Sequence, residues 1–272
     1  MSELKPTLIA PPGACDTHIH IYAPGAGPAW PCDVAAYRTL QHRLGLERAV
    51  IVQPVAYGAD NSVTVNAVAA LGLSTTRGIA VVEPSVSDAE LDRLTQAGMR
   101  GVRFHMLPGG ALPWEALEPV AARVAAFGWH VQLQMDGRFL AEREDRLKAL
   151  PGNLVIDHVG KFLEPVSTSD PAFLSLLRLL QGGRTWLKLS APYEVSKSGP
   201  PRFEDVGALA KAAVKAAPSR MLWASNWPHP SAKNPPDDAM LLDLLVDWVP
   251  EQAVRRRILV ENPAELYGFT SH

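Results

Sequence analysis

The sequence predicts an α/β protein, a single (β/α)8 TIM barrel, regular or distorted, with a C-terminal helical extension. Three observations support this fold class. Eight short apolar or β-branched runs recur along the chain, segments rich in Ala, Leu, Glu and Arg separate them, and no shift in composition marks an internal boundary. Strands that alternate with helices form a parallel sheet covered on both faces, and eight such strands close a barrel. We therefore expect residues 1–272 to form one domain.

The expected strands are the short runs in which apolar residues dominate. They cover residues 14–21, 48–54, 77–82, 101–105, 130–135, 153–158, 185–190 and 220–225. A doubly wound open sheet is the alternative. That fold would favour a Gly-rich phosphate-binding loop after the first strand, and the sequence has none there.

The expected helices lie between these runs and have good end signals. They cover residues 88–97, 114–127, 138–150, 171–181, 203–216 and 237–249, and a final helix and loop over 251–269 is expected to pack on the outside. Ser87 and Asp170 are suited to cap helix N-termini, because their side-chain oxygens accept bonds from free backbone N–H groups. Gly98, Gly128 and Gly182 stand where helices should end.

Composition excludes several classes of protein. The formal net charge is −2, so no broad basic field indicates a nucleic acid or an anionic membrane as partner. Cys15 and Cys32 are the two cysteines, too few for a disulfide scaffold or a four-thiolate zinc module, and they favour a reducing, cytoplasmic setting. No apolar run is long enough to span a bilayer, and the first five residues lack the pattern of a signal peptide.

Polar side chains gather at the C-terminal ends of the expected strands, which is where a TIM barrel carries its chemistry. Asp16, His18 and His20 alternate along the first strand, so we expect all three on one face, pointing into the barrel mouth. The other candidates at strand ends are Gln53, Arg103, His105, Gln132, Gln134, Asp136, Asp157, His158, Lys188, Ser190, Tyr193, Glu194, Ser225, Asn226 and His229.

Two of the charged candidates have an equally simple structural role. Arg103 is suited to hold an anion, but an ion pair with Asp136 or Asp157 at the barrel rim would also explain it. Lys188 lies inside a strand and must find a partner, which favours a structural ion pair. Cys15 precedes Asp16 and should point to the opposite face, into the core.

Several motifs resemble the amidohydrolase superfamily, in particular its amidohydrolase-related TIM-barrel branch. They are DTHIH at 16–20, DHVGK at 157–161, WASNWPHP at 223–230 and ENPA at 261–264. The resemblance extends over residues 13–268. Within the branch, the chain is similar to members that process small carboxylated lactones, and both hydrolases and an isomerase belong to that group.

The resemblance implies a role for each candidate. His18, His20 and His158 would polarise the lactone carbonyl, with Asp16 orienting the first two. Arg103 would hold a substrate carboxylate, since paired N–H groups of an arginine match a carboxylate in charge and geometry. The remaining expected substrate-binding residues are Gln53, Gln134, Tyr193, His229 and Lys188.

Asn226 departs from the pattern, because hydrolytic members usually carry Asp at this point. A carboxylate can accept a proton from water, whereas a carboxamide cannot at any relevant pH. Three explanations are open. The asparagine is an introduced replacement, or another group such as Asp157 or His158 is the base, or the reaction needs no activated water and Asn226 positions a substrate hydroxyl.

No cofactor is favoured. A zinc ion held by His18, His20 and His158 is the alternative, but the strand-8 position offers an amide, and the lactonases that the chain resembles act without metal. Without a metal, the three imidazoles would serve as hydrogen-bond donors to the developing oxyanion.

The sequence thus predicts a hydrolase that opens the ring of a small carboxylated lactone. The alternative is a lactone isomerase that moves an acyl group between hydroxyls of an aldarolactone. A non-catalytic barrel that binds small acids and a metal-dependent decarboxylase are more distant hypotheses. The sequence identifies neither the particular lactone nor the oligomeric state.

Overall fold

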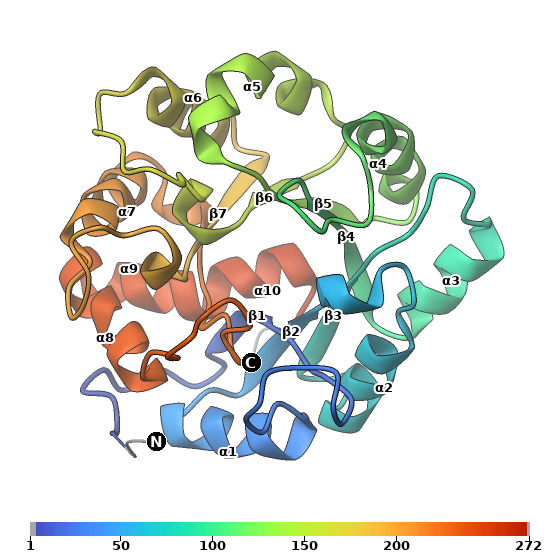
Figure 1. Ribbon diagram of the computed structural model, residues 1–272, viewed down its shortest axis with the longest axis horizontal. Coiled ribbons are helices and arrows are strands. Elements are labelled where there is room, and N and C mark those ends of the chain that lie inside the picture. Colours follow the sequence, from blue (N-terminus) through green and yellow to red (C-terminus); the bar gives the residue numbers. More distant parts are fainter. Residues whose placement is uncertain (1–3, 271–272) are drawn as a thin grey trace.

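A computed structural model describes residues 4–270 and shows eight parallel strands arranged as a barrel (Figure 1). Each strand pairs in parallel with the next one along the chain, from first to last. The strands are β1 (Cys15–Ile19), β2 (Arg48–Val52), β3 (Thr76–Ala80), β4 (Met99–His105), β5 (His130–Gln134), β6 (Leu154–Ile156), β7 (Thr185–Leu189) and β8 (Met221–Trp223). Each overlaps one of the eight expected runs, so the predicted TIM barrel is confirmed.

The barrel is distorted where β1 meets the segment after β8. The backbone N–H of Asn226 donates to the carbonyl of His18 at 3.0 Å, and that of His20 donates to the carbonyl of Trp227 at 2.8 Å. On the other side of β1, Asp16 lies opposite Ala49 while Ile19 lies opposite Ile51. Three steps along β1 therefore face two steps along β2, which is a bulge.

This bulge overturns the expectation that Asp16, His18 and His20 share one face. One extra residue reverses the alternation within the strand, so Asp16 and the two histidines point to different sides. The Asp16 carboxylate accepts bonds from the hydroxyl and the backbone N–H of Ser225, at 2.5 and 3.0 Å. It therefore joins β1 to the end of β8. It also accepts a 3.2 Å bond from the backbone N–H of His18, so it contacts the backbone of that residue and not an imidazole.

Eight helices lie around the barrel, as Figure 1 shows. They are α1 (Val34–Leu44), α2 (Ser62–Leu71), α3 (Asp88–Gln96), α4 (Leu117–Ala125), α5 (Leu140–Ala149), α6 (Pro171–Gln181), α7 (Glu204–Ala216) and α8 (Asp238–Trp248). Ser87 and Asp170 cap α3 and α6 as predicted, accepting bonds from the second or third backbone N–H of the helix. Gly182 ends α6 in a right-handed conformation, and the positive φ of +80° belongs to Gly183 instead.

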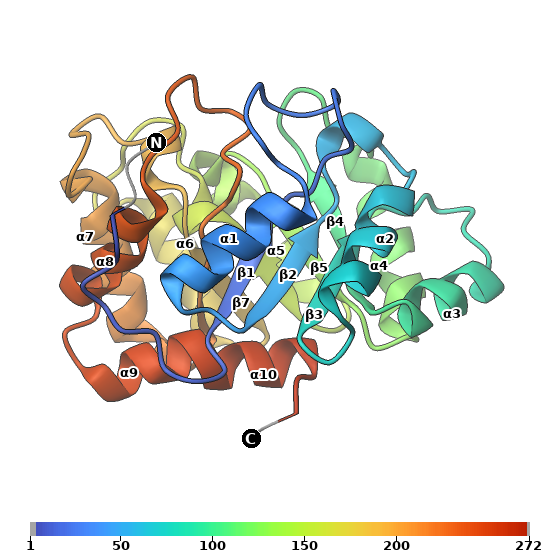
Figure 2. The same cartoon turned by 90° about the horizontal axis from the view of Figure 1, so that it is seen from below.

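The C-terminal extension closes one end of the barrel. The helices α9 (Gln252–Arg256) and α10 (Asn262–Tyr267), joined by a π-helical turn, run across the end opposite the long loops (Figure 2). Tyr267 and Phe269 are buried in the cluster that fills the barrel interior, where Cys15 also packs as expected. The expectation that this segment packs only on the outside is therefore wrong.

None of the helices within residues 4–270 combines the length and the apolar character needed to cross a bilayer. Residues 1–3, which belong to the stretch inspected for a signal peptide, lie outside the described part of the chain.

Candidate active site

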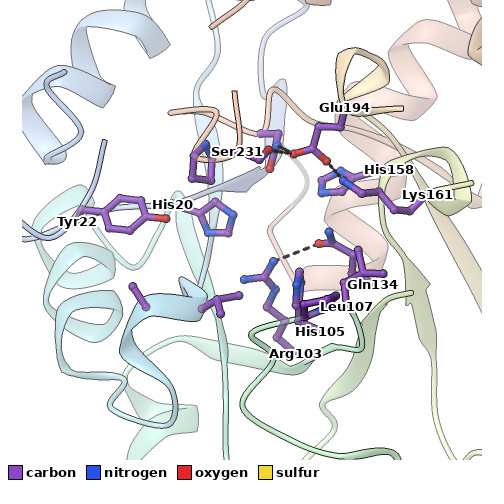
Figure 3. Close-up of a pocket in the computed structure, with 15 residues that line it drawn as sticks. His20, Tyr22, Arg103, His105, Leu107, Gln134, His158, Lys161, Glu194 and Ser231 are labelled. Atoms are coloured by element: carbon purple, nitrogen blue, oxygen red, sulfur yellow. Dashed lines mark hydrogen bonds and ion pairs between the residues drawn. The ribbon is translucent and has the colours of Figure 1, made fainter. Parts of the chain in front are cut away.

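A cavity of about 380 Å³ opens at the C-terminal ends of the strands (Figure 3). Polar and charged side chains from the strand ends and the loops that follow them face this space. The polar and aromatic lining residues are His20, Tyr22, Arg103, His105, Gln134, His158, Lys161, Glu194, Asn226 and Ser231. Apolar residues such as Val55, Leu107 and Pro230 complete the wall.

An unusual backbone conformation after β6 brings two of these residues to the cavity. His158, Val159, Gly160 and Lys161 all have positive φ angles, between 50° and 85°. A β-branched residue such as Val159 rarely adopts this conformation, which costs free energy and is found mainly at functional sites. The turn places both the His158 imidazole and the Lys161 ammonium at the cavity.

Arg103, at the end of β4, is a buried cation that faces the cavity. Its two terminal nitrogens donate to the backbone carbonyl of Gln53 at 2.8 Å and to the side chain of Gln134 at 3.2 Å. Asp136 pairs with Arg138 instead, at 2.6 Å. The rim ion pair considered from the sequence is therefore not formed, and the Nε–H of Arg103 has no partner among the described residues.

The three imidazoles meet as the sequence predicts, but they are not equivalent. The ring centroid of His18 lies 4.8 Å from that of His20 and 4.9 Å from that of His158. Burial lowers the pKa of all three, that of His20 to about 3, so each ring is neutral at pH 7. His20 donates from Nδ1 to the carbonyl of Val52 at 2.7 Å, which leaves its Nε2 as an acceptor.

The acceptor nitrogen of His20 lies 3.2 Å from Nε2 of His18, so the proton of that bond is carried by His18. His18 is fully buried and lies beneath the cavity rather than in its wall. His158 makes its bond through Nδ1, to the hydroxyl of Ser190 at 2.8 Å, and Nε2 has no partner among the described residues. When the Ser190 hydroxyl donates to Nδ1, the neutral ring of His158 carries its proton on Nε2 and can donate it to a ligand.

A charged group lies directly beneath the imidazoles. The Lys188 ammonium lies 2.7 Å from the Gln132 side-chain oxygen, 3.3 Å from Nδ1 of His18 and 3.5 Å from the Asp157 carboxylate. Burial lowers the pKa of Lys188 to about 8, and the charge of Asp157 opposes that shift. Burial by itself would raise the pKa of Asp157, but the Lys188 ammonium and its other neighbours hold it below the usual range.

The arrangement provides a test of the zinc alternative. The ligand atoms of His18, Asp157 and His158 lie within 4.8 Å of one another in the described chain. The Lys188 ammonium, however, contacts both Asp157 and His18, and its charge would repel a divalent ion at that point. The nitrogens of His18 and His20 are joined by a hydrogen bond. These residues therefore do not fit a resident divalent metal.

A second polar network, formed by Tyr193, His229 and Asp238, holds the Asn226 side chain. Its amide nitrogen donates to the Tyr193 hydroxyl at 2.9 Å, and this hydroxyl lies 2.9 Å from Nδ1 of His229. Nε2 of His229 in turn lies 3.1 Å from the Asp238 carboxylate. The Oδ1 atom of Asn226 is buried without a partner among the described residues. That oxygen is therefore the acceptor that the amide can offer to a ligand.

Sequence reasoning assigned no role to Lys161 and Glu194, which form a buried ion pair in the cavity wall (Figure 3). Burial lowers the pKa of Lys161 to about 8, against the charge of Asp157. Lys161 is the last residue of the DHVGK motif, and Glu194 is one of the candidates after the strand at 185–190. The residue types did not reveal the left-handed turn at 158–161 that directs Lys161 toward the cavity.

Several expected site residues lie behind the cavity wall. Gln53 is fully buried, and its amide holds the loop carbonyls of Gly58 and Asp60. Tyr193 and His229 support Asn226, as described above. His18, Asp157 and Lys188 form the layer beneath. These residues position the wall, whereas His20, Arg103, Gln134, His158 and Asn226 belong to it.

Comparison with known proteins identifies the family of this chain. A family model described as amidohydrolase matches residues 15–269. The chain belongs to this amidohydrolase family. D-galactarolactone isomerase of Agrobacterium fabrum is 36% identical, over 99% of this chain and 96% of its own. 2-pyrone-4,6-dicarboxylate hydrolase of Comamonas testosteroni is 35% identical, over 97% of this chain and 92% of its own.

A solved structure has the same fold throughout. Agrobacterium tumefaciens ATU3138, in its apo form, superposes with a TM-score of 0.92 at 36% identity, covering 98% of this chain and all of its own. The amidohydrolase family and the curated relatives consist of enzymes, and the relatives include a lactone isomerase and lactone hydrolases.

Proposed function

We propose that this amidohydrolase isomerises a small carboxylated lactone. The acyl group would move from the ring oxygen to a hydroxyl of the same molecule. The observation that carries the proposal is Asn226, which lines the cavity. By the resemblance of the sequence motifs, this is the position at which hydrolytic members usually have Asp. Its unpartnered Oδ1 can accept a bond from a hydroxyl but cannot remove a proton from water.

The other residues of the wall fit the same substrate class. Arg103 has a free N–H and a charge that no carboxylate of the described chain neutralises by contact, which suits a substrate carboxylate. His158 would donate from Nε2 to the carbonyl oxygen as it becomes an oxyanion. The relative from Agrobacterium fabrum, named as an isomerase of an aldaric lactone, supports this choice of substrate.

Ring hydrolysis, the leading hypothesis from the sequence, is the second candidate. It is favoured by Glu194, a carboxylate in the cavity wall that could take a proton from water. The relative named as a pyrone dicarboxylate hydrolase also supports it. In both candidates a carbon–oxygen bond forms at the lactone carbonyl while the ring carbon–oxygen bond breaks.

The proposal can be tested by proton NMR on purified protein mixed with single aldarolactones that carry one free carboxylate. We expect the signals of a second lactone to grow before those of the open-chain diacid. A sample with heat-inactivated protein corrects for spontaneous ring migration. If the open diacid is the first product to form, the isomerase proposal is wrong.

We further propose that the reaction needs no metal, because the Lys188 ammonium contacts His18 and Asp157, two of the three side chains that could hold a divalent ion. Dialysis against a chelator should leave turnover within about twofold of the untreated protein. Added zinc should not increase turnover, and metal analysis of the active protein should find well under one equivalent. Loss of activity on dialysis that zinc restores would contradict this prediction.

A further inference from the structure

Glu194 occupies a distinctive position in the site. It ends the 3-10 turn Pro192–Glu194 that follows β7, and its side chain is 9% exposed at the cavity. One carboxylate oxygen pairs with the Lys161 ammonium. The other accepts a bond from the Ser231 hydroxyl and lies 3.4 Å from the amide nitrogen of Asn226.

No other carboxylate lines this cavity in the described part of the chain. Asp157, one of the two bases considered from the sequence, is fully buried beneath the wall between Lys188 and Gln132. His158, the other, has Nδ1 bonded to Ser190, and with the Ser190 hydroxyl as donor in that bond its Nε2–H serves as the donor to the carbonyl oxygen. The acyl transfer still needs a group that takes a proton from the attacking hydroxyl.

We propose that Glu194 is this proton acceptor, standing beside Asn226 in place of a carboxylate at position 226. The inference rests on the proposed lactone chemistry and assigns its acid–base step. Before the reaction, Asn226 would accept the bond of the attacking hydroxyl at Oδ1, while its amide nitrogen faces Glu194. Once Glu194 is released, the hydroxyl would turn its single proton from Oδ1 to that carboxylate. The hydroxyl and the carboxylate would then lie on neighbouring sides of one amide group.

The ion pair with Lys161 would keep the Glu194 carboxylate from accepting a proton before substrate binds. Lys161 and Glu194 also line an adjoining cavity of about 540 Å³, so the pair stands between two spaces open to ligands. In the free protein, Glu194 is bonded to Lys161, Ser231 and Asn226. Arg103 and Lys161 line the same cavity, so the one carboxylate of the substrate would bind between them and compete with Glu194 for the Lys161 ammonium. The base would therefore be released after the substrate has filled the cavity.

The step balances without any further reactant. The attacking hydroxyl gives its proton to Glu194 as its oxygen bonds to the lactone carbonyl carbon. The tetrahedral intermediate collapses, the bond from carbon to the ring oxygen breaks, and Glu194 returns the proton to that oxygen. In hydrolysis, water would take the place of the hydroxyl, and the same carboxylate would serve.

The test compares Glu194→Gln with a control, Glu164→Gln. Glu164 is an exposed glutamate that pairs with Lys197. We expect Glu194→Gln to lower kcat about 10²- to 10⁴-fold, the range for a general acid or base. KM should change by only a few fold. The rate of the variant should lose the acidic limb of its pH profile and increase with hydroxide. The control should stay within twofold of the unmodified protein.

A second variant covers the case in which glutamine disturbs the fold. Glu194→Ala should be inactive, and added formate should restore part of its kcat, because a free carboxylate can enter the space that the side chain leaves. If Glu194→Gln retains kcat within threefold while the unmodified protein converts lactones, Glu194 is not the acceptor and the proposed function stands. If the unmodified protein converts no carboxylated lactone, the function and the inference both fail.

Discussion

Replacing Lys188 by methionine should lower the free energy of unfolding by about 3–5 kcal/mol, the cost of removing one partner from a buried ion pair. Lys188 and Asp157 are fully buried, and the variant would leave the carboxylate of Asp157 without its closest cation. The Gln132 side-chain oxygen would also lose its 2.7 Å bond. Urea unfolding followed by circular dichroism gives the measurement.

The matched control is Lys148→Met. Lys148 also pairs with a carboxylate, that of Glu144, but its side chain is 48% exposed. Removing an exposed pair costs about 0–1 kcal/mol. A double variant, Lys188→Met with Asp157→Leu, should recover part of the loss, since no charge then stays buried alone. If Lys188→Met is as stable as Lys148→Met, the ion pair does not support the site.

Replacing Arg103 by methionine should raise KM for carboxylated lactones about 30- to 700-fold, which corresponds to about 2–4 kcal/mol of lost charge-assisted bonding. The guanidinium is held by Gln53 and Gln134 and keeps one N–H free. Methyl esters of the same lactones carry no anion to lose, so their KM should change far less. Steady-state kinetics on matched acid and ester pairs provides the measurement.

Arg138→Met is the control for Arg103. Arg138 lies on the next loop, is 41% exposed and pairs with Asp136, so its loss should leave KM for both substrate types within about twofold. An equal loss for acids and esters in the Arg103 variant would mean that this arginine maintains the wall through its bonds and does not recognise the carboxylate.

The fold could be predicted because its signal is local. Each strand is a short apolar run, and Ser87 and Asp170 carry the capping chemistry in their own side chains. The gathering of the three imidazoles could also be predicted, because parallel strands bring their C-terminal ends to one rim. His18 and His158 are 140 positions apart by number and their rings lie 4.9 Å apart.

The remaining features depend on backbone geometry that residue types do not reveal. A one-residue bulge in β1 separates the side chains of Asp16 and His18, although strict alternation would place them on one face, and Asp16 contacts only the backbone N–H of His18. Four left-handed residues after β6 direct Lys161 into the cavity, and Val159 is a residue that no propensity would place there. The pairing of Lys161 with Glu194 could not be foreseen without that turn.

The same geometry separates the roles of neighbouring polar residues. Tyr193 and His229 hold the Asn226 amide in place at the cavity wall, and its buried oxygen has no partner among the described residues. Glu194 stands next to that amide and is masked by Lys161. Asn226 can accept a hydrogen bond but cannot deprotonate water, and an anionic substrate would release Glu194 beside it. This pair is suited to transfer of an acyl group between hydroxyls of a substrate that fills the cavity.

The incorporation of heavy oxygen from water tests this account most directly. The protein is incubated with a carboxylated aldarolactone in H₂¹⁸O, and both lactone and open-chain products are collected early and analysed by mass spectrometry. The account predicts a rearranged lactone without ¹⁸O, because the attacking oxygen comes from the substrate itself. A product that carries one ¹⁸O per turnover would contradict it and establish water as the nucleophile.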